Sequence, residues 1–361
     1  MTYFENQTEQ LEMTFVPASY WLRLARFLNF GSEDGTYSAP ARALKIEDVP
    51  ATLVCLKVDG LRVVRAAVEI SLSGRAASTD AALFVLALAA SPGFADAETI
   101  GAALNALPQV ARTSAQLCTF AAFAENFRGW GRGLRSAIAA WYLNQPGSEL
   151  AYRMLETMEH NGWSHRDLLR LSHPKAATAV HNALFQWAVE GELGHLATPE
   201  ILASDLRQVR GYELAKKSAS EDEVVSLIEE NRLSSSMIPA QWLESRLVWE
   251  ALLPSLSYQD LVSQVGRLTE VGLLEPQSPV TALVVARLID RKRIRNSRIH
   301  PAALLEVLDA YRLAPGAVSS IANALEEAFY LAFGISSRLA IACTWRWMRP
   351  AENRPHLPCP T

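Results

Sequence analysis

The chain is interrupted at short intervals by residues that end helices. Proline lacks the backbone donor that a helix interior needs and glycine weakens a helix, so clusters of the two mark helix ends. Between the interruptions apolar residues recur at helical spacing, and those of Leu61–Ile70 fit a helix better than a strand. The spacing predicts an all-α fold of paired antiparallel helices, as in HEAT-like repeats, although the residues show no fixed period. The interruptions fall at Pro92–Gly93, Asn144–Gly147, Pro174, Gly194–Pro199, Pro254, Pro276–Pro279 and Leu313–Gly316.

The composition predicts a folded protein of the reducing cytoplasm. Half of the 361 residues are hydrophobic, enough for the core of one large domain or two ordinary ones. Four scattered cysteines, with no Cys-x-x-Cys pair, argue against a zinc site and against a disulfide framework. Met1–Gln10 lacks the basic and apolar regions of a signal peptide. The most apolar stretch, Ala81–Ala90, is too short to cross a bilayer, so we expect no membrane partner.

The sequence patterns of common enzymes are missing. Histidines are numerous between His160 and His195, yet none forms the His-Glu-x-x-His pair of a zinc hydrolase helix. A phosphate-binding glycine loop and a Gly-x-Ser-x-Gly nucleophile turn are also missing from the sequence. The acidic runs Glu221–Glu223 and Glu229–Glu230 fit helix-start and solvated residues better than the carboxylates of a nuclease. We therefore predict that the chain is not an enzyme and needs no metal or other cofactor.

The stretch Asn161–Lys175 contains a well-defined helix start. Ser164 and Asp167 have the spacing of a capping box, in which each side chain accepts a backbone N–H that the first turn leaves unpaired. Trp163 and Leu168 then occupy the two positions of a hydrophobic staple, which fixes how the chain enters the helix. The residues expected to face the core are Leu168 and Leu171.

The same helix is predicted to present a cationic stripe. Arg166, Arg170 and His173 fall at i, i+4 and i+7, which places them along one helix face, and Pro174 ends the helix just beyond them. Taken alone, such a stripe is most simply explained as a solvated surface, because charged residues on helices usually face water.

The formal net charge of −4 shows that any binding to nucleic acid must be local. Several Lys and Arg side chains acting together can still hold phosphates and release counterions. An exposed connector between helices is the alternative explanation for a basic run. Two further clusters stand out: Arg128, Arg132 and Arg135, with glycines at 129, 131 and 133 that predict a loop at the start, and the run that contains Arg291, Arg295 and Arg298.

The order of these motifs resembles the Ro ribonucleoprotein family, whose shared module is the TROVE domain. The likeness extends from about Tyr20 to about Phe333. It implies a closed or nearly closed ring of HEAT-like repeats around a central hole. The other segments that carry it, in order, are Arg26–Tyr37, Trp130–Tyr142, Leu227–Leu233, Gly272–Pro276, Arg298–Pro301 and Ala328–Tyr330.

The resemblance implies an RNA-binding ribonucleoprotein component in RNA quality control or decay. Its partners would be small noncoding Y-like RNA and the single-stranded 3′ ends of misfolded RNA, which enter the hole. Bacterial relatives also suggest an exoribonuclease partner, whereas no DNA partner is expected. A protein-binding helical-repeat scaffold that does not bind RNA is the alternative function.

The resemblance also assigns candidate RNA-binding residues. His173 matches the family's motif histidine associated with RNA contact, and Arg166, Arg170 and Lys175 follow as phosphate partners. The remaining candidates come from the two further clusters: Arg128, Arg132, Arg135, Arg291, Arg295 and Arg298.

The chain departs from the family pattern just before this helix. Members with strong Y-RNA binding carry Lys and Arg where this chain has Glu156 and His160. Because a carboxylate repels phosphate, we expect a weakened outer-surface RNA site, with RNA in the central hole less affected.

The resemblance divides the chain into three parts. Residues 1–19 are an N-terminal segment, residues 20–333 the TROVE helical-repeat domain, and residues 334–361 an irregular tail. Ro-type members continue into a von Willebrand A-like domain with a divalent cation site, whereas here Trp345–Pro350 is followed by proline-rich residues, so no metal is expected. In a shifted reading frame, this stretch could encode the first residues of such a domain. One hypothesis is therefore that the tail is a truncated or frameshifted start of a von Willebrand A-like domain.

Overall fold

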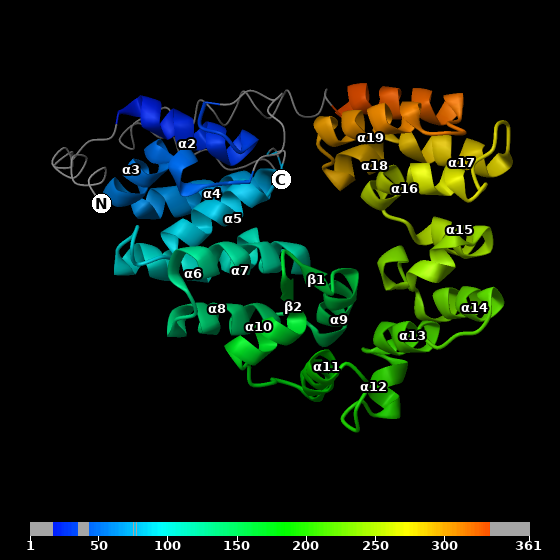
Figure 1. The fold of residues 1–361 in the computed structure, drawn as a ribbon, viewed down its shortest axis with the longest axis horizontal. Coiled ribbons are helices and arrows are strands. Elements are labelled where there is room, and N and C mark those ends of the chain that lie inside the picture. Colours follow the sequence, from blue (N-terminus) through cyan, green and yellow to red (C-terminus); the bar gives the residue numbers. More distant parts are fainter. Residues whose placement is uncertain (1–16, 35–42, 75, 77, 333–361) are drawn as a thin grey trace. The chain divides into compact units, whose positions relative to one another are not determined.

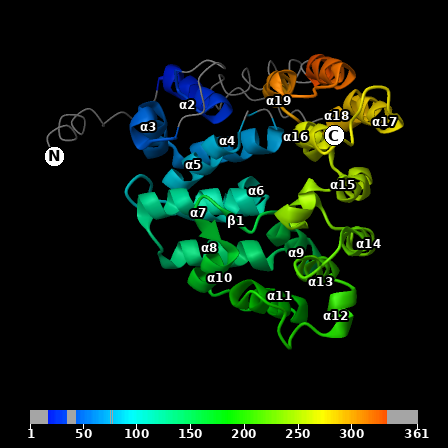
Figure 2. The ribbon, with the colours of Figure 1, turned by 45° about the vertical axis from the view of Figure 1, so that its right-hand side comes forward.

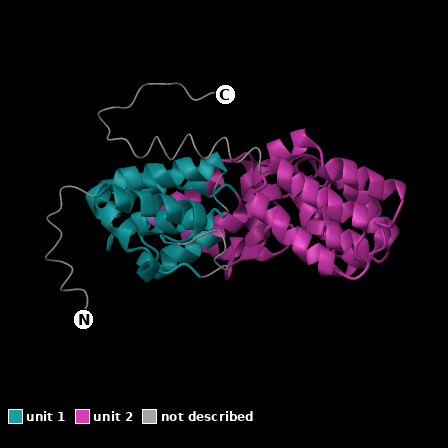
Figure 3. Cartoon of the chain, turned by 90° about the horizontal axis from the view of Figure 1, so that it is seen from above, with its two compact units in different colours: residues 1–112, 119–133, 337–361 teal, residues 113–118, 134–336 magenta. Residues whose placement is uncertain are grey.

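A computed structural model describes residues 17–34, 43–74, 76 and 78–332, and almost all of its regular elements are helices (Figure 1). The chain divides into two compact units, which are described separately (Figure 3). Within the described residues, unit 1 contains those up to Arg112 together with Thr119–Gly133, and unit 2 contains Thr113–Cys118 and residues 134–332. The predicted all-α fold is confirmed, whereas the predicted tail lies outside the described residues.

Unit 1 is built around one fully buried helix. Leu83, Phe84 and the other residues of Ala81–Ala89 are buried, because the helix is apolar on every side. Phe84 packs at ring-centroid distances of 5.1 to 5.7 Å against Phe27, Phe123 and Phe127. The helices are α2 (Ala18–Phe30), α3 (Pro50–Val58), α4 (Gly60–Ser73), α5 (Asp80–Ala89), α6 (Ala97–Val110) and α7 (Ser114–Arg128), with a 3-10 turn, η1, at Ile46–Asp48. The first residues of α7, up to Cys118, belong to unit 2.

A buried carboxylate fixes the start of α3. Glu33, which is 2% exposed, accepts the backbone N–H groups of Ala51 and Thr52 at 3.1 and 2.7 Å. The Thr52 hydroxyl donates to it as well, and Arg23 lies 3.3 Å away. The charge of Glu33 is therefore balanced by a cation and by the positive end of a helix. This residue of the Arg26–Tyr37 motif has a structural role.

Unit 2 is a succession of short helices in which neighbours along the chain pack against each other, as α13, α14 and α15 do (Figure 2). The predicted interruptions at Asn144–Gly147, Gly194–Pro199 and Pro276–Pro279 all fall between helices. The first half contains α8 (Arg132–Leu143), which begins in unit 1, α9 (Gly147–Glu156), α10 (His165–Ser172), α11 (Ala179–Glu190), α12 (Pro199–Ala203) and α13 (Arg207–Ala215).

The second half of unit 2 continues the same pattern. Its α-helices are α14 (Glu221–Asn231), α15 (Arg246–Leu252), α16 (Tyr258–Glu270), α17 (Pro279–Leu288), α18 (Arg291–Ser297) and α19 (Pro301–Leu313). A further helix covers residues 319–332 of the described part. The 3-10 turns are η2 (Ser235–Met237), η3 (Ala240–Glu244) and η4 (Leu253–Ser255).

A small antiparallel hairpin precedes α10. Its strands are β1 (Glu159–His160) and β2 (Trp163–Ser164), with His160 paired to Trp163. The two-residue loop is Asn161-Gly162, with φ angles of 51° and 76°. Asn-Gly is the pair that a tight hairpin turn with two positive φ angles prefers.

Candidate nucleic-acid interface

The start of α10 is fixed as predicted by a capping box. The Asp167 N–H donates to Ser164 Oγ at 3.3 Å, and the Ser164 N–H donates to Asp167 Oδ2 at 3.2 Å. The predicted staple residues Trp163 and Leu168 are both buried. Leu171, which was predicted to face the core, is only half-buried. Leu169 is the buried residue instead, at 4% exposure. The helix is only two turns long, so its orientation depends strongly on these contacts at its start.

A buried histidine ties α10 to two neighbouring segments. The side chain of His165 lies 2.7 Å from the Tyr142 hydroxyl through Nδ1 and 3.1 Å from the Thr157 carbonyl through Nε2. Because a carbonyl only accepts, Nε2 carries the proton and the Tyr142 hydroxyl donates to Nδ1. Burial lowers the pKa of His165 to about 4, in agreement with this neutral ring. Arg166, the next residue along the chain, is thereby held at a fixed position.

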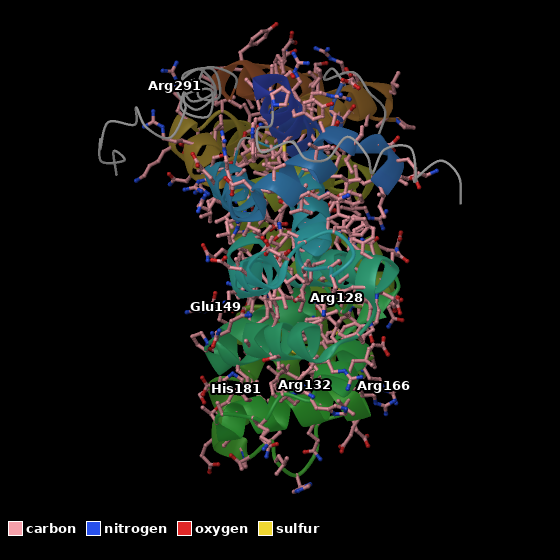
Figure 4. The ribbon with its side chains drawn as sticks, turned by 90° about the vertical axis from the view of Figure 1, so that its left-hand side faces the viewer. Arg128, Arg132, Glu149, Arg166, His181 and Arg291 are labelled. Atoms are coloured by element: carbon pink, nitrogen blue, oxygen red, sulfur yellow. The ribbon has the colours of Figure 1, made fainter. Side chains whose placement is uncertain are left out.

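The exposed face of α10 carries two cations. Arg166 and Arg170 are exposed, one helical turn apart, and neither forms an ion pair or side-chain hydrogen bond with any other residue that the structure describes. The side chain of Arg166 projects away from the ribbon (Figure 4). Both guanidinium groups are therefore available to an external anion such as phosphate.

His173 is not the third member of the helical stripe, and that prediction is wrong. Helix α10 ends at Ser172, and His173 is its C-cap, with a left-handed backbone at φ 47°. Pro174 explains the early end, because the residue before a proline disfavours the helical conformation. His173 and Lys175 are exposed in the segment that follows the helix, so they lie next to the stripe in sequence without continuing its face.

The second predicted cluster is divided between structural and exposed residues. Arg128, the last residue of α7, donates to the carbonyl oxygen of Ala90 at 2.6 Å and is partly buried, which lowers its pKa. It therefore binds the C-terminal end of α5. The predicted glycine loop lies at residues 129–131, and α8 begins at Arg132. Arg132 and Arg135 are exposed on α8 and form no ion pair with another described residue.

The third cluster lies on and just after a short helix, α18. Arg287, a further basic residue just before this run, lies on α17 and is not available to a ligand, because its guanidinium donates to the carbonyl oxygens of Leu253 and Leu256, each at 2.7 Å. Arg291 and Arg295 lie one turn apart on α18 and are exposed, and Arg291 projects from the ribbon in Figure 4. The C-cap of this helix is Arg298, also exposed and left-handed, with φ 52°.

Glu156 and His160, the expected departures from the family pattern, lie just before α10 in the chain. Glu156 ends α9 and is exposed, as is His160 in β1. Partial desolvation and the nearby carboxylate of Asp260 raise the pKa of Glu156. This position therefore contributes negative charge beside a second acidic group.

Two contacts of this region have no local signal in the sequence. Tyr142 and Thr157 hold His165, yet neither carries a local motif that would predict this role. The Asn161-Gly162 turn was detectable, since Asn-Gly between two short runs is the strongest short-range hairpin signal.

The described part of the chain was also compared with the requirements of a metal site, a reactive thiol and a membrane span. No group of three His, Cys, Asp or Glu side chains suited to a metal occurs there. Burial raises the pKa of both Cys55 and Cys118 to about 12, so neither thiol is reactive, whereas Cys343 and Cys359 lie outside the described residues. Among the same residues, no helix is long and apolar enough to cross a membrane.

These features define a helical-repeat protein with a clamped, cationic helix. The family model of the TROVE domain matches residues 7–241 and 231–314, so the chain belongs to the TROVE domain family. It is 32% identical over 323 residues to the RNA-binding protein RO60 of Deinococcus radiodurans, covering 86% of this chain and 59% of that protein. It is 27% identical to the RNA-binding protein RO60 of Caenorhabditis elegans, covering 91% of this chain and 63% of that protein.

A solved structure agrees with the family assignment. The crystal structure of the Deinococcus radiodurans RO (RSR) protein superposes with a TM-score of 0.73 at 32% sequence identity. The match covers 87% of this chain and 64% of that one. The chain thus spans about six-tenths of the length of the relatives that it matches.

Proposed function

We propose that this chain binds RNA and that the exposed face of α10 contacts the RNA phosphates. The observation that carries the proposal is the pair Arg166 and Arg170, exposed and without ion pairs in the described residues, on a helix fixed by its capping box. Guanidinium groups bind phosphate through two parallel hydrogen bonds, which makes such a pair well suited to a nucleic-acid backbone. Two relatives of this chain are named RNA-binding proteins.

The accessibility of the other basic residues decides how much each would contribute to RNA binding. His173 and Lys175 would extend the contact beyond the end of α10, while Arg132 and Arg135 on α8, and Arg291, Arg295 and Arg298 on α18, would contribute elsewhere. Arg128 would contribute least, because its guanidinium already binds the Ala90 carbonyl.

The ligand would be a structured RNA with an accessible single strand. Small noncoding Y-like RNA and the 3′ ends of misfolded RNA are the proposed ligands, in RNA quality control or decay, with a ring of repeats receiving the strand. We further propose that the protein is located in the cytoplasm and binds RNA without catalysing a reaction. Its protein partner would be an exoribonuclease, and DNA would not be a ligand. Glu156 beside Asp260 would weaken binding on the surface next to α10, since phosphate is repelled by carboxylates.

A protein-binding scaffold is the second candidate function. The observation in its favour is a set of large apolar side chains exposed in the last third of unit 2: Leu283 at 53%, Leu313 at 87% and Tyr330 at 66%. A scaffold that uses these residues would not require any affinity for RNA.

A binding titration separates the two functions. A stem-loop RNA with a single-stranded 3′ tail and the same RNA without the tail would be titrated over a range of salt, with duplex DNA as control. The proposal predicts tighter binding of the tailed RNA and an affinity that falls linearly on a log–log plot against salt. A salt slope without tail preference would overturn the strand-end claim alone. No binding to either RNA would overturn the proposed function and leave the scaffold.

A further inference from the structure

Three helices of unit 2 end in a basic residue whose backbone is left-handed. The C-caps of α2, α4 and α11 in the described chain are glycines with positive φ, the residue that this conformation prefers. The C-caps of α10, α14 and α18 are instead His173, Arg232 and Arg298, with φ of 47°, 54° and 52°. A side chain in this conformation costs about 1–2 kcal/mol relative to glycine. Backbone strain alone would therefore favour glycine at these three positions.

The side chain of Arg232 is not needed to complete the end of α14. Its own backbone N–H closes the helix on the carbonyl of Ile228, and its carbonyl accepts the Gln208 side chain at 3.0 Å. Helix α18 has a related arrangement, in which the Gln259 side chain donates at 2.9 Å to the carbonyl of Ser297, the residue before the C-cap. In both cases a glutamine in the second position of a neighbouring helix completes the hydrogen bonding. The guanidinium of Arg232 has no part in these bonds.

The guanidinium of Arg232 is exposed and forms no ion pair within the described part of the chain, although Glu229 and Glu230 lie just before it. Gln208, which reaches the Arg232 carbonyl, directly follows Arg207, which also lacks an ion-pair partner among the described residues. The first turn of α13 contains no acidic residue. Arg207 and Arg232 thus belong to two adjacent helices that this hydrogen bond joins.

The competing explanation is a favourable interaction with the helix dipole. A cation at a helix C-terminus stabilises the helix by about 0.3–1 kcal/mol, which offsets part of the cost of about 1–2 kcal/mol for the left-handed backbone. Replacement by glycine should therefore leave the protein folded and at least as stable as the parent. Any effect of that replacement on ligand binding can then be measured in a folded protein.

We propose that Arg232 is a phosphate-contacting residue and that the edge formed by α13 and α14 is a second RNA-binding surface, with Arg207 beside it. The inference rests on the proposed function and extends it to Arg232, which lies in the Leu227–Leu233 motif but is not among the candidate RNA-binding residues of the sequence analysis. The ligand class is the sugar–phosphate backbone of RNA, because guanidinium groups bind phosphate oxygens and phosphate contacts carry no sequence information.

The test is Arg232→Gly in the full chain, with thermal unfolding and RNA titration over a range of salt. Arg232→Gly is expected to keep or slightly raise the melting temperature of the parent, to bind the tailed stem-loop RNA about threefold more weakly, and to lower the salt slope by about 0.7–0.9. The matched control is Gln277→Gly, since Gln277 is exposed and left-handed (φ 64°) but neutral. It should leave both RNA affinity and slope unchanged.

The outcomes are distinguishable from those of the proposed function. If the parent binds RNA and Arg232→Gly binds with the same affinity and slope, Arg232 is a helix cap only and this inference is overturned alone. If Arg232→Gly and Gln277→Gly weaken binding equally, the effect comes from backbone freedom and the inference also fails. A parent chain that binds no RNA overturns the inference together with the proposed function. Arg232→Lys, which retains the charge, should keep most of the affinity.

Discussion

The Tyr142 hydroxyl donates a 2.7 Å hydrogen bond to Nδ1 of His165, and both side chains are buried. The Thr157 carbonyl accepts from the opposite side of the ring at 3.1 Å, so the imidazole is held neutral between two segments of unit 2. This bridge determines where the cationic face of α10 begins, because Arg166 is the next residue.

The bridge should make the protein sensitive to acid. Burial lowers the pKa of His165 to about 4 in the folded state, whereas the unfolded chain has the ordinary value of about 6.5. The unfolded state therefore binds more protons between these values, and the free energy of unfolding should fall by up to about 3 kcal/mol as pH decreases through this window. Urea unfolding at pH 7.5 and pH 4.5 measures the change.

His165→Gln is the control for that measurement, because the carboxylates of the protein titrate in the same range. The variant should be less stable than the parent at pH 7.5 and lose less stability on acidification. An equal loss in parent and variant would show that His165 does not contribute to the pH dependence.

The capping box should be worth about 1 kcal/mol to the fold. Ser164→Ala removes the acceptor of the Asp167 N–H and should lower the free energy of unfolding by that amount, as measured with urea. Ser226→Ala is the matched control, since Ser226 is an exposed serine within α14 whose hydroxyl bonds only to the Asp222 carbonyl. The control should be neutral or slightly stabilising, because alanine is the better helix former. Equal destabilisation of both variants would contradict the capping role.

A substitution in the hairpin turn should lower the stability of the protein through backbone conformation alone. Gly162 has φ 76° and an added Cβ would meet no atom within 4 Å, so Gly162→Ala should destabilise by about 1 kcal/mol through backbone strain alone. Gly101 in α6 has equally open surroundings and no positive φ, so Gly101→Ala should stabilise by about 0.5–1 kcal/mol. Thermal unfolding of the two variants should thus shift in opposite directions, and a stabilising Gly162→Ala would be incompatible with the left-handed turn.

Restoring a cation beside α10 should strengthen RNA binding. Glu156→Lys replaces a repulsive carboxylate with a phosphate partner, so its affinity for a structured RNA should exceed that of the parent, most clearly at low salt. Glu306→Lys on α19 makes the same change in net charge at another exposed glutamate. An equal gain in both variants would attribute the effect to net charge and not to the neighbourhood of α10.

Features that depend on neighbours in sequence could be predicted from the sequence. The Ser164–Asp167 capping box and the interruptions at proline and glycine involve residues a few positions apart, and each recurs in the structure. The end of α10 was placed too late, because Pro174 disfavours the helical conformation at His173 itself.

Which cations are available to a ligand could not be predicted in this way. Arg128 and Arg287 belong to basic clusters, yet their guanidinium groups bind the carbonyl oxygens of Ala90 and Leu253, which are more than thirty residues away. Tertiary contacts of this kind leave no local pattern. The same reasoning applies to Tyr142, whose partner His165 lies on a different helix.

The measurement that tests the central claim most directly is the salt dependence of RNA affinity in Arg166→Gln/Arg170→Gln. Each phosphate contact contributes about 0.7–0.9 to the slope of log affinity against log salt, so the double variant should lose about 1.4–1.8 from the slope of the parent and bind more weakly at low salt. Arg246→Gln is the control, because Arg246 is exposed but paired with Glu275 at 3.3 Å, and it should behave as the parent. A double variant with the affinity and slope of the parent would contradict RNA contact by α10.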